Sequence, residues 1–274
     1  VKGSHIVLPR RYDGAHAYIL QNDDRRVVFM IPYEERYTLI GTTDIAVGSE
    51  PALPRPSADE VDYLCRATSR YLARAIAPAD VVWSYAGVRP LYDDGTANPS
   101  AVTRDYTLRL DADQGAAPVL SVYGGKITTY RKLAEHALDK LAPWFAQMGA
   151  AWSAQEPLPG GDAGSDADAI ADGELARDWP WLARDARLAL ARRHGTRARR
   201  VLDGARASED LGAYFGGELY AREIDYMIVH EWARSAQDIC YRRSKAALHM
   251  TAAQRTAVAD YVSGRVAQLG MRVR

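Results

Sequence analysis

The hydrophobic period of the sequence changes along the chain, and these changes constrain its fold more than any other feature. The first part holds short β-branched or aromatic runs separated by turn-forming stretches, which is typical of strands. These runs are Ile6-Val7-Leu8, Ala17 to Leu20, Arg26 to Pro32 and Tyr37 to Gly41. Because short connections favour antiparallel pairing, the pattern predicts an antiparallel meander.

A helical period replaces this pattern at Ser57. Ser57 and Glu60 have the spacing of a capping box, in which each side chain bonds the backbone of the other. Apolar residues then recur at helical spacing as far as Leu72, which predicts an amphipathic helix of about four turns. Two further strand-like runs follow, at residues 80–87 and 101–110.

A strand, a glycine turn and a helix then follow one another closely. The run from Pro118 to Tyr123 is apolar without strict alternation, which predicts a strand buried on both faces. Gly124-Gly125 ends it, and the residues from Thr128 to Phe145 show a helical period.

The composition shifts once more between Gln155 and Gly173, where a glycine-rich and proline-rich stretch indicates a linker. The segments after it have helical patterns, at residues 182–193, 197–202, 219–235 and 251–269. We therefore predict an α+β fold, with a mixed part before a boundary near residue 150 and a helical domain after it.

Composition excludes several functional classes. The 274 residues carry 35 basic and 35 acidic side chains, so bulk electrostatics do not favour nucleic-acid binding. The only two cysteines, Cys65 and Cys240, are far apart, which argues against a disulfide framework or a zinc site. No apolar run is long enough for a membrane-spanning helix. The chain opens without Met or a signal-peptide pattern, and we expect its start at Val1 to be a truncation or processing point.

The junction around Lys126 has the features of an anion-binding turn. Two glycines allow a ligand to approach the backbone closely, and the following helix start offers unpaired N–H groups and partial positive charge. Lys126 adds a full charge, and Thr128 and Thr129 add hydroxyls. The alternative is an ordinary strand–helix connection with threonine caps and a solvated lysine. A Walker loop is excluded because its first glycine is absent.

Three other side chains are candidates for binding or proton transfer. Arg89, at a predicted strand end before Pro90, and Arg104 could each grip a phosphate or carboxylate. His5, before an apolar strand, could act as a base near neutral pH. The alternatives are surface arginines, a structural ion pair for Arg104, and a half-buried structural histidine.

The remaining polar clusters give weaker signals. The histidines lack the spacing of a shared metal site, and neither HExxH nor GxSxG is present. Basic clusters occur at residues 192–200 and 242–245, and nearby acidic residues nearly balance them. They fit a solvated helix face or, alternatively, a surface that binds anionic lipid headgroups.

Several motifs, taken together and in order, resemble the aerobic FAD-dependent glycerol-3-phosphate dehydrogenase family. They are Lys2-Gly3-Ser4-His5-Ile6-Val7, Ile40-Gly41-Thr42-Thr43-Asp44, Tyr85-Ala86-Gly87-Val88-Arg89-Pro90-Leu91, Thr103-Arg104-Asp105-Tyr106 and the stretch from Gly124 to Glu135. The helical part matches through Asp210-Leu211-Gly212, His230-Glu231-Trp232 and the stretch from Asp238 to Arg243.

The resemblance implies a flavoenzyme that oxidises sn-glycerol 3-phosphate to dihydroxyacetone phosphate, with hydride transfer to FAD and electrons passed on to quinone. Residues 1–115 would form the antiparallel substrate-binding sheet. Residues 116–148 would be the returning strand and helix of the FAD domain, and residues 149–274 the helical domain. The resemblance also implies a cytoplasmic protein that attaches peripherally to anionic lipid at the inner face of the cytoplasmic membrane. A homodimer is possible.

The resemblance also assigns roles to the candidates. Arg89, Arg104 and Lys126 would bind substrate, and His5, Arg89 and Lys126 would serve catalysis, with His5 accepting the substrate's hydroxyl proton. The flavin ring would be lined by Gly125, Lys126, Ile127 and Thr128. There, Lys126 would stabilise the negative charge of the reduced flavin.

The sequence departs from the family in lacking the GxGxxG segment that holds the FAD pyrophosphate. We therefore expect a carboxy-terminal portion that lacks the N-terminal FAD-binding segment and is inactive by itself. Two alternatives remain open: a glycerol-3-phosphate oxidase that uses oxygen, and a non-catalytic module that binds a partner or a membrane surface.

Overall fold

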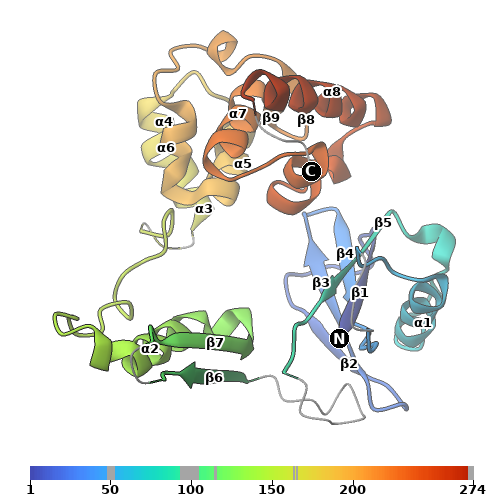
Figure 1. Cartoon of the computed structure of the whole chain (residues 1–274). Helices are drawn as coiled ribbons and strands as arrows, with labels where there is room; N and C mark the ends of the chain where they lie inside the picture. Colours follow the sequence, from blue (N-terminus) through green and yellow to red (C-terminus); the bar gives the residue numbers. More distant parts are fainter. Residues whose placement is uncertain (48–52, 93–104, 114–115, 163, 165, 271–274) are drawn as a thin grey trace. The chain divides into compact units, whose positions relative to one another are not determined.

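The computed structural model describes residues 1–47, 53–92, 105–113, 116–162, 164 and 166–270 (Figure 1). The chain divides into an N-terminal unit, Val1–Ala154, and a C-terminal unit, Gln155–Arg274. The N-terminal unit contains β1 (Lys2–Pro9), β2 (Tyr18–Gln21), β3 (Val27–Tyr33), β4 (Tyr37–Gly41), α1 (Ala58–Ser69), β5 (Trp83–Val88), β6 (Tyr106–Asp111), β7 (Val119–Gly124) and α2 (Tyr130–Leu141). Short 3-10 helices lie at Pro78–Asp80, Ile127–Thr129 and Ala142–Trp144.

The first five strands form one sheet in the order β2-β3-β4-β1-β5 (Figure 1). All of its neighbouring strands are antiparallel, as the short connections predict. In strand β1, which lies between β4 and β5, His5 is opposite Gly41 of β4 on one side and Tyr85 of β5 on the other. This register decides which side chains can meet on each face of the sheet.

Helix α1 covers one face of this sheet. The capping box at its start is present: the Ser57 hydroxyl oxygen accepts from the Glu60 N–H, and Glu60 Oε2 accepts from the Ser57 N–H. Leu64 of α1 packs with Ile6 and Ile40 of the sheet in a buried core. Because successive strand residues point to opposite faces, His5 lies on the face away from α1.

Strands β6 and β7 pair antiparallel in a separate two-stranded sheet, and α2 follows them (Figure 1). The prediction that residues 118–123 form a strand is confirmed, but the prediction that this strand is buried on both faces is wrong. No described residue of β6, β7 or α2 is buried, and Val119, Val122 and Tyr123 are exposed. An apolar run predicts burial, but it is buried only where another segment covers it. Among the described residues, no segment buries β7.

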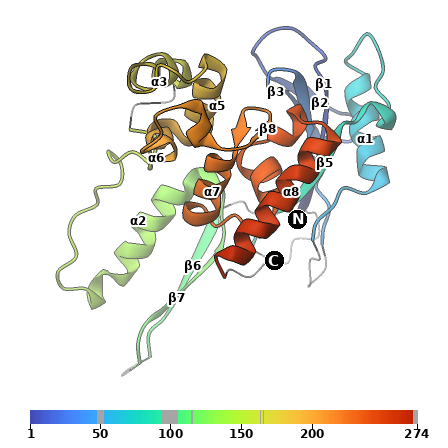
Figure 2. The same cartoon turned by 90° about the horizontal axis from the view of Figure 1, so that it is seen from above.

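The C-terminal unit is predominantly helical. Its helices are α3 (Ala167–Asp172), α4 (Glu174–Asp178), α5 (Arg184–His194), α6 (Ala198–Leu202), α7 (Ala221–His230) and α8 (Ala252–Gln268), with short 3-10 helices at Gly195–Arg197, Ser208–Leu211 and Ala246–His249 and a π-helical turn at Asp238–Arg243. Helix α8 packs against α7 through a core that includes Ile224, Ile228 and Val262 (Figure 2).

The α+β fold class is confirmed, with one addition in the helical part. Residues Tyr214–Gly216 and Leu219–Tyr220 pair as a small hairpin, β8 and β9, where a helix was predicted to begin at Leu219. Gly216 and Gly217 both have positive φ, at 97° and 57°, so the chain turns back before α7 begins at Ala221.

Candidate active site

The imidazole of His5 lies on the face of the sheet opposite α1, among aromatic rings of β5. It stacks on Tyr85 with ring centroids 5.0 Å apart and ring planes 6° apart, and Tyr85 stacks in turn on Trp83. Gly41 makes room for it: a Cβ at this position would lie 2.2 Å from Cδ2 of His5. The ring is therefore held between a glycine on one neighbouring strand and a tyrosine on the other.

The environment of His5 favours a neutral imidazole. Burial, followed by the nearby Arg89 charge, lowers the pKa of His5 below its usual value of 6.5, so the ring is neutral at neutral pH. Its Nδ1 is buried and has no hydrogen-bond partner within the described part of the protein. A neutral imidazole has one ring nitrogen that can accept a proton.

The guanidinium of Arg89 is oriented by two side chains that follow β4. Its Nη1 donates to Asp44 Oδ1 at 2.8 Å, and its Nη2 donates to Thr42 Oγ1 at 3.3 Å. The Arg89 side chain keeps 30% of its surface exposed, while that of Asp44 keeps 17%. Since a guanidinium has five N–H donors, Arg89 retains capacity to bind an anion.

His5 and Arg89 were predicted from the sequence, but the residues that position them were not. Thr42 and Asp44 lie in a motif that was recognised only as part of the resemblance. Gly3 is also needed, because a Cβ there would lie 2.7 Å from Nη1 of Arg89. The strand register was the missing signal, since it sets Gly3 opposite Gly87, near the end of β5 that leads into Arg89. Arg104 lies outside the described residues.

The turn from β7 to α2 leaves its residues open. Lys126 and Thr128 are exposed, and Ile127 has 85% of its surface exposed. Thr129 does not cap the helix: its hydroxyl donates to the backbone oxygen of Lys126 at 2.9 Å, and no side chain caps either Ile127–Thr129 or α2. The helix start therefore keeps the open N–H groups that an anion or a ring oxygen can use.

Three features of this turn are open to a ligand. Gly124 and Gly125 adopt φ values of 70° and 94°, and neither has a side chain that would cover the backbone. The exposed apolar side chain of Ile127 and the cation of Lys126 follow them. A planar, electron-rich ring can use all three features. Among the described contacts, none joins Lys126 to His5 or Arg89, so the structure brings together only part of the predicted site.

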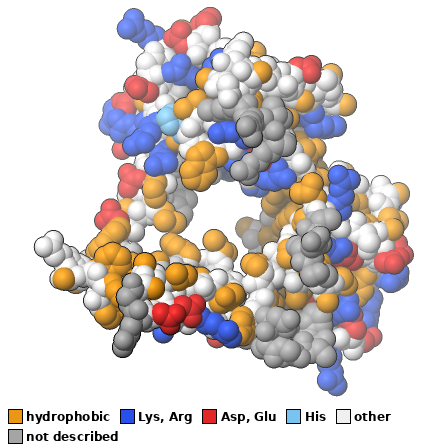
Figure 3. All heavy atoms as spheres, in the orientation of Figure 1, with side chains coloured by type: hydrophobic (Ala, Val, Ile, Leu, Met, Phe, Trp, Pro, Cys, Tyr) orange, Lys and Arg blue, Asp and Glu red, His pale blue; other side chains and the backbone are white. Residues whose placement is uncertain are grey.

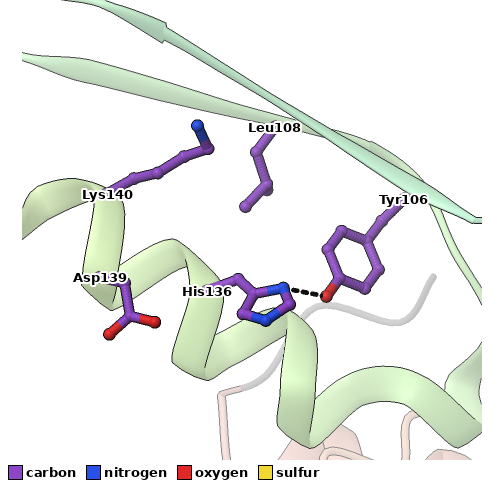
Figure 4. Close-up of a pocket in the computed structure, with 5 residues that line it drawn as sticks. All are labelled: Tyr106, Leu108, His136, Asp139 and Lys140. Carbon is purple, nitrogen blue, oxygen red and sulfur yellow. Dashed lines mark hydrogen bonds between the residues drawn. The ribbon is translucent and has the colours of Figure 1, made fainter.

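A groove of about 370 Å³ lies between β6 and α2 (Figure 4). Tyr106 of β6 points toward His136 of α2, and its hydroxyl is hydrogen-bonded to His136 Nδ1. Leu108, Asp139 and Lys140 complete the lining. Apolar side chains also gather over β6, β7 and α2 on the face that Figure 3 shows. The groove thus belongs to an open surface rather than to an enclosed pocket.

The C-terminal unit contains a buried ionic cluster around His194. Nε2 of His194 is 2.8 Å from Glu223 Oε1, and Nδ1 is 3.3 Å from Glu231 Oε1. Arg193 Nη1 is 3.0 Å from Glu223 Oε2, and its side chain is only 11% exposed. The prediction of a solvated basic face is therefore wrong for Arg193, because Glu223 is distant in sequence and its pairing could not be seen locally.

The other basic residues of the clusters are more exposed. Arg199 pairs with Glu174 at 3.2 Å, and Arg242 pairs with Asp238 at 2.8 Å, each with about half of the arginine side chain exposed. Within the described ranges, no helix is both long and apolar enough to cross a bilayer.

Two family models match the chain in succession. Residues 1–131 match the FAD-dependent oxidoreductase family, and residues 152–270 match the C-terminal domain of alpha-glycerophosphate oxidase. Together the two matches take in most of the chain.

Curated relatives are similar over nearly the whole chain. A glycerol-3-phosphate dehydrogenase of Pseudomonas aeruginosa is 50% identical over 96% of this chain and 51% of its own length. A D-erythritol 1-phosphate dehydrogenase of Brucella abortus is 46% identical over 95% of this chain and 52% of its own length. The aerobic glycerol-3-phosphate dehydrogenase of Escherichia coli is 42% identical over 96% and 52%. The chain spans about half the length of these relatives.

Proposed function

The chain belongs to the family of FAD-dependent oxidoreductases that includes the glycerol-3-phosphate dehydrogenases, and from this premise we propose that it carries the substrate-binding part of an enzyme oxidising sn-glycerol 3-phosphate to dihydroxyacetone phosphate. The observation that carries the proposal is the pairing of a neutral His5 with an Arg89 guanidinium that Asp44 and Thr42 hold in place. One group can accept a proton, and the other can bind an anionic substrate.

Arg89 binds the substrate on its phosphate or hydroxyl side. Asp44 takes one N–H group of the guanidinium and fixes its plane, which leaves other donors for a charge-assisted, two-point contact. Lys126 adds a second cation, and Arg104 is a further substrate ligand in this proposal. Two cations suit a substrate that carries a phosphate dianion.

His5 removes the hydroxyl proton as the substrate carbon is oxidised. FAD, when bound, supplies the hydride acceptor. The hydroxyl proton passes to the imidazole of His5, and the carbon–oxygen bond becomes a carbonyl. The lowered pKa of His5 keeps the ring neutral and ready for this step.

The second half of the proposal concerns the turn after β7. The backbone at Gly125, together with Lys126, Ile127 and Thr128, would contact the flavin ring, and Lys126 would stabilise negative charge that develops there. The rest of the cofactor would be held by an FAD-binding segment outside this chain. The exposed apolar residues of β7 and α2 support this, since such a surface favours coverage by another part of the protein.

Arg89→Lys tests the substrate role directly. Lysine keeps the charge but lacks the planar guanidinium, which can direct separate N–H groups at Asp44 and at a ligand oxygen, so glycerol 3-phosphate should bind the chain about tenfold or more weakly in a calorimetric titration. The matched control is Arg66→Lys, because Arg66 lies exposed on α1 and pairs with Asp62. Equal affinity in the Arg89 variant and the unaltered chain would remove Arg89 from the site.

A second substrate is favoured by one observation. The relative from Brucella abortus is named for D-erythritol 1-phosphate and is nearly as similar as the first relative. A longer polyol phosphate offers the same phosphate and secondary hydroxyl to Arg89 and His5. Titration of the chain with both compounds decides between them, since the true substrate should bind more tightly.

We propose quinone as the electron acceptor. In this proposal the protein is held peripherally by anionic lipid at the inner face of the cytoplasmic membrane, and it forms a homodimer. The match to an oxidase C-terminal domain favours oxygen as the alternative. Hydrogen peroxide released during turnover would indicate the oxidase. Sedimentation with anionic but not neutral vesicles would support membrane attachment, and failure to sediment with either would remove it.

A further inference from the structure

We propose that Glu60 is a positioning residue for the candidate active site. It acts from the face of the sheet that α1 covers, and it fixes the two segments that carry His5, Thr42 and Asp44. The inference rests on the proposed function of His5 and Arg89, and it adds a residue that touches neither of them.

Glu60 makes four polar contacts. Its Oε1 accepts hydrogen bonds from the Ser4 hydroxyl and the Thr43 hydroxyl, both at 2.8 Å. Its Oε2 lies 2.8 Å from Lys2 Nζ and accepts from the Ser57 N–H at 2.9 Å. A capping box requires only the bond to Ser57, so three of the four contacts serve another purpose.

Successive side chains of β1 point to opposite faces of the sheet. Lys2 and Ser4 bind Glu60, while Gly3 and His5 between and beside them face the candidate site. Thr43 also binds Glu60, and its sequence neighbours Thr42 and Asp44 hold the Arg89 guanidinium. One carboxylate therefore ties together both segments whose opposite sides form the site.

A backbone bond joins the same two segments. The Ser4 N–H donates to the Thr43 hydroxyl oxygen at 2.9 Å, and that hydroxyl in turn donates to Glu60. The Thr43 hydroxyl is thus fixed both as an acceptor and as a donor. Movement of Glu60 would release this link, and the two segments would then be joined by the β1–β4 pairing and by the two backbone hydrogen bonds between Lys2 and Ile45.

Glu60 carries its negative charge in a buried position. The Glu60 side chain is only 6% exposed, so its contacts must compensate for the loss of water. Burial alone raises the pKa of Glu60, but the hydrogen bonds from its four partners outweigh burial and lower the pKa to about 2. The group is a carboxylate at neutral pH, and it holds its donors by charge-assisted hydrogen bonds.

Glu60→Gln in the full chain tests this role, with the pKa of His5 as the readout. The amide cannot pair with Lys2 and cannot accept all four hydrogen bonds, so both segments should loosen. Water should then reach His5, and Arg89 should move away from it. We expect the pKa of His5, followed by NMR on histidine-labelled protein, to rise by about half a unit or more toward its usual value.

Two further variants keep the test decisive. Ser4→Ala removes one bond to Glu60 and should raise the pKa of His5 by a smaller amount, and it replaces Glu60→Gln if that variant does not fold. Glu135→Gln is the matched control, because Glu135 is also held by Lys132 and Ser153 but lies on α2. It should leave His5 unchanged.

The proposal is overturned if the folded Glu60 and Ser4 variants keep the unaltered pKa of His5, or if the Glu135 variant shifts it equally. A lower unfolding temperature with an unchanged His5 pKa would reduce Glu60 to a purely structural residue. Binding of glycerol 3-phosphate to the unaltered chain is measured separately. Its absence would contradict the proposed function without affecting the His5 result.

Discussion

Gly41 shows how one residue without a side chain can define the candidate site. A Cβ at this position would overlap the ring of His5, at 2.2 Å from Cδ2 and 2.7 Å from both Cγ and Nε2. The ring could escape only by leaving its stack on Tyr85. The absence of a side chain at Gly41 therefore leaves the space that the His5 ring occupies.

Gly41→Ala should accordingly displace His5 and lower the free energy of unfolding by about 1–3 kcal/mol, the usual cost of overpacking. Chemical denaturation measures the loss. Gly87→Ala is the control, since a Cβ there would meet nothing within 4 Å and should cost no stability. Equal unfolding midpoints for the two variants would contradict the crowding of His5.

His194 gives the C-terminal unit a pH dependence of known sign. Burial alone lowers the pKa of His194, but its bonds to Glu223 and Glu231 outweigh burial and raise the pKa to about 9. A raised folded-state pKa contributes stability that is complete below the unfolded-state value of about 6.5 and is lost as the pH rises through about 9.

The unfolding temperature should therefore fall between pH 7 and pH 9. His194→Gln removes the titrating group, so this variant should be less stable at pH 7 and should lose that slope. Thermal unfolding monitored by circular dichroism at several pH values measures both. An unaltered chain whose stability is flat across this range would show that His194 is not held as a cation.

At the residue scale, the sequence indicated which groups could do chemistry but not what holds them. His5 and Arg89 were named from local context, and they do lie near each other. Asp44 was missed because a carboxylate in a loop has no local signature. Glu60 was predicted as a capping residue, which is correct, but its bonds to Ser4 and Thr43 depend on how α1 packs on the sheet.

At the scale of elements, the β6–β7 hairpin and α2 differ from the main sheet because they have no buried residue in the described structure. Apolar side chains such as Tyr130 and Leu138 remain exposed on α2. Elements without a core depend on local hydrogen bonds and open easily.

Amide hydrogen exchange should therefore be faster in β6, β7 and α2 than in β1 and β4, whose buried residues include Ile6 and Ile40. Mass spectrometry of the exchanging chain compares them within one sample, so the sheet serves as the internal control. Addition of an FAD-binding segment from a relative should slow exchange in β7 and α2. Equal protection of both regions in the chain alone would contradict the idea of an uncovered surface.

Most elements were predictable because their signals are local. Short β-branched or aromatic runs between turn residues indicated the strands of the main sheet, and the capping box defined the start of α1. The exposure of β7 was not predictable, because an apolar run does not show whether another segment covers it. The β8–β9 hairpin was missed because its two strands are very short and Leu219 fits the helical period of the residues that follow.

At the scale of the whole chain, each unit has its own buried core. The sheet and α1 share one core in the N-terminal unit, and two clusters fill the C-terminal unit, one around Leu190 and Leu202 and the other around Ile228 and Val262. His5 and Arg89 both lie in the N-terminal unit.

The central claim is that this chain supplies the substrate site for flavin-linked oxidation of glycerol 3-phosphate. The most direct test joins the chain to the part of the Pseudomonas aeruginosa relative that lies outside their match, and records the visible spectrum without oxygen before and after adding glycerol 3-phosphate. We predict a flavin band that bleaches with the unaltered chain and bleaches far more slowly with Arg89→Lys. A bound flavin that stays oxidised in the presence of glycerol 3-phosphate would contradict the account.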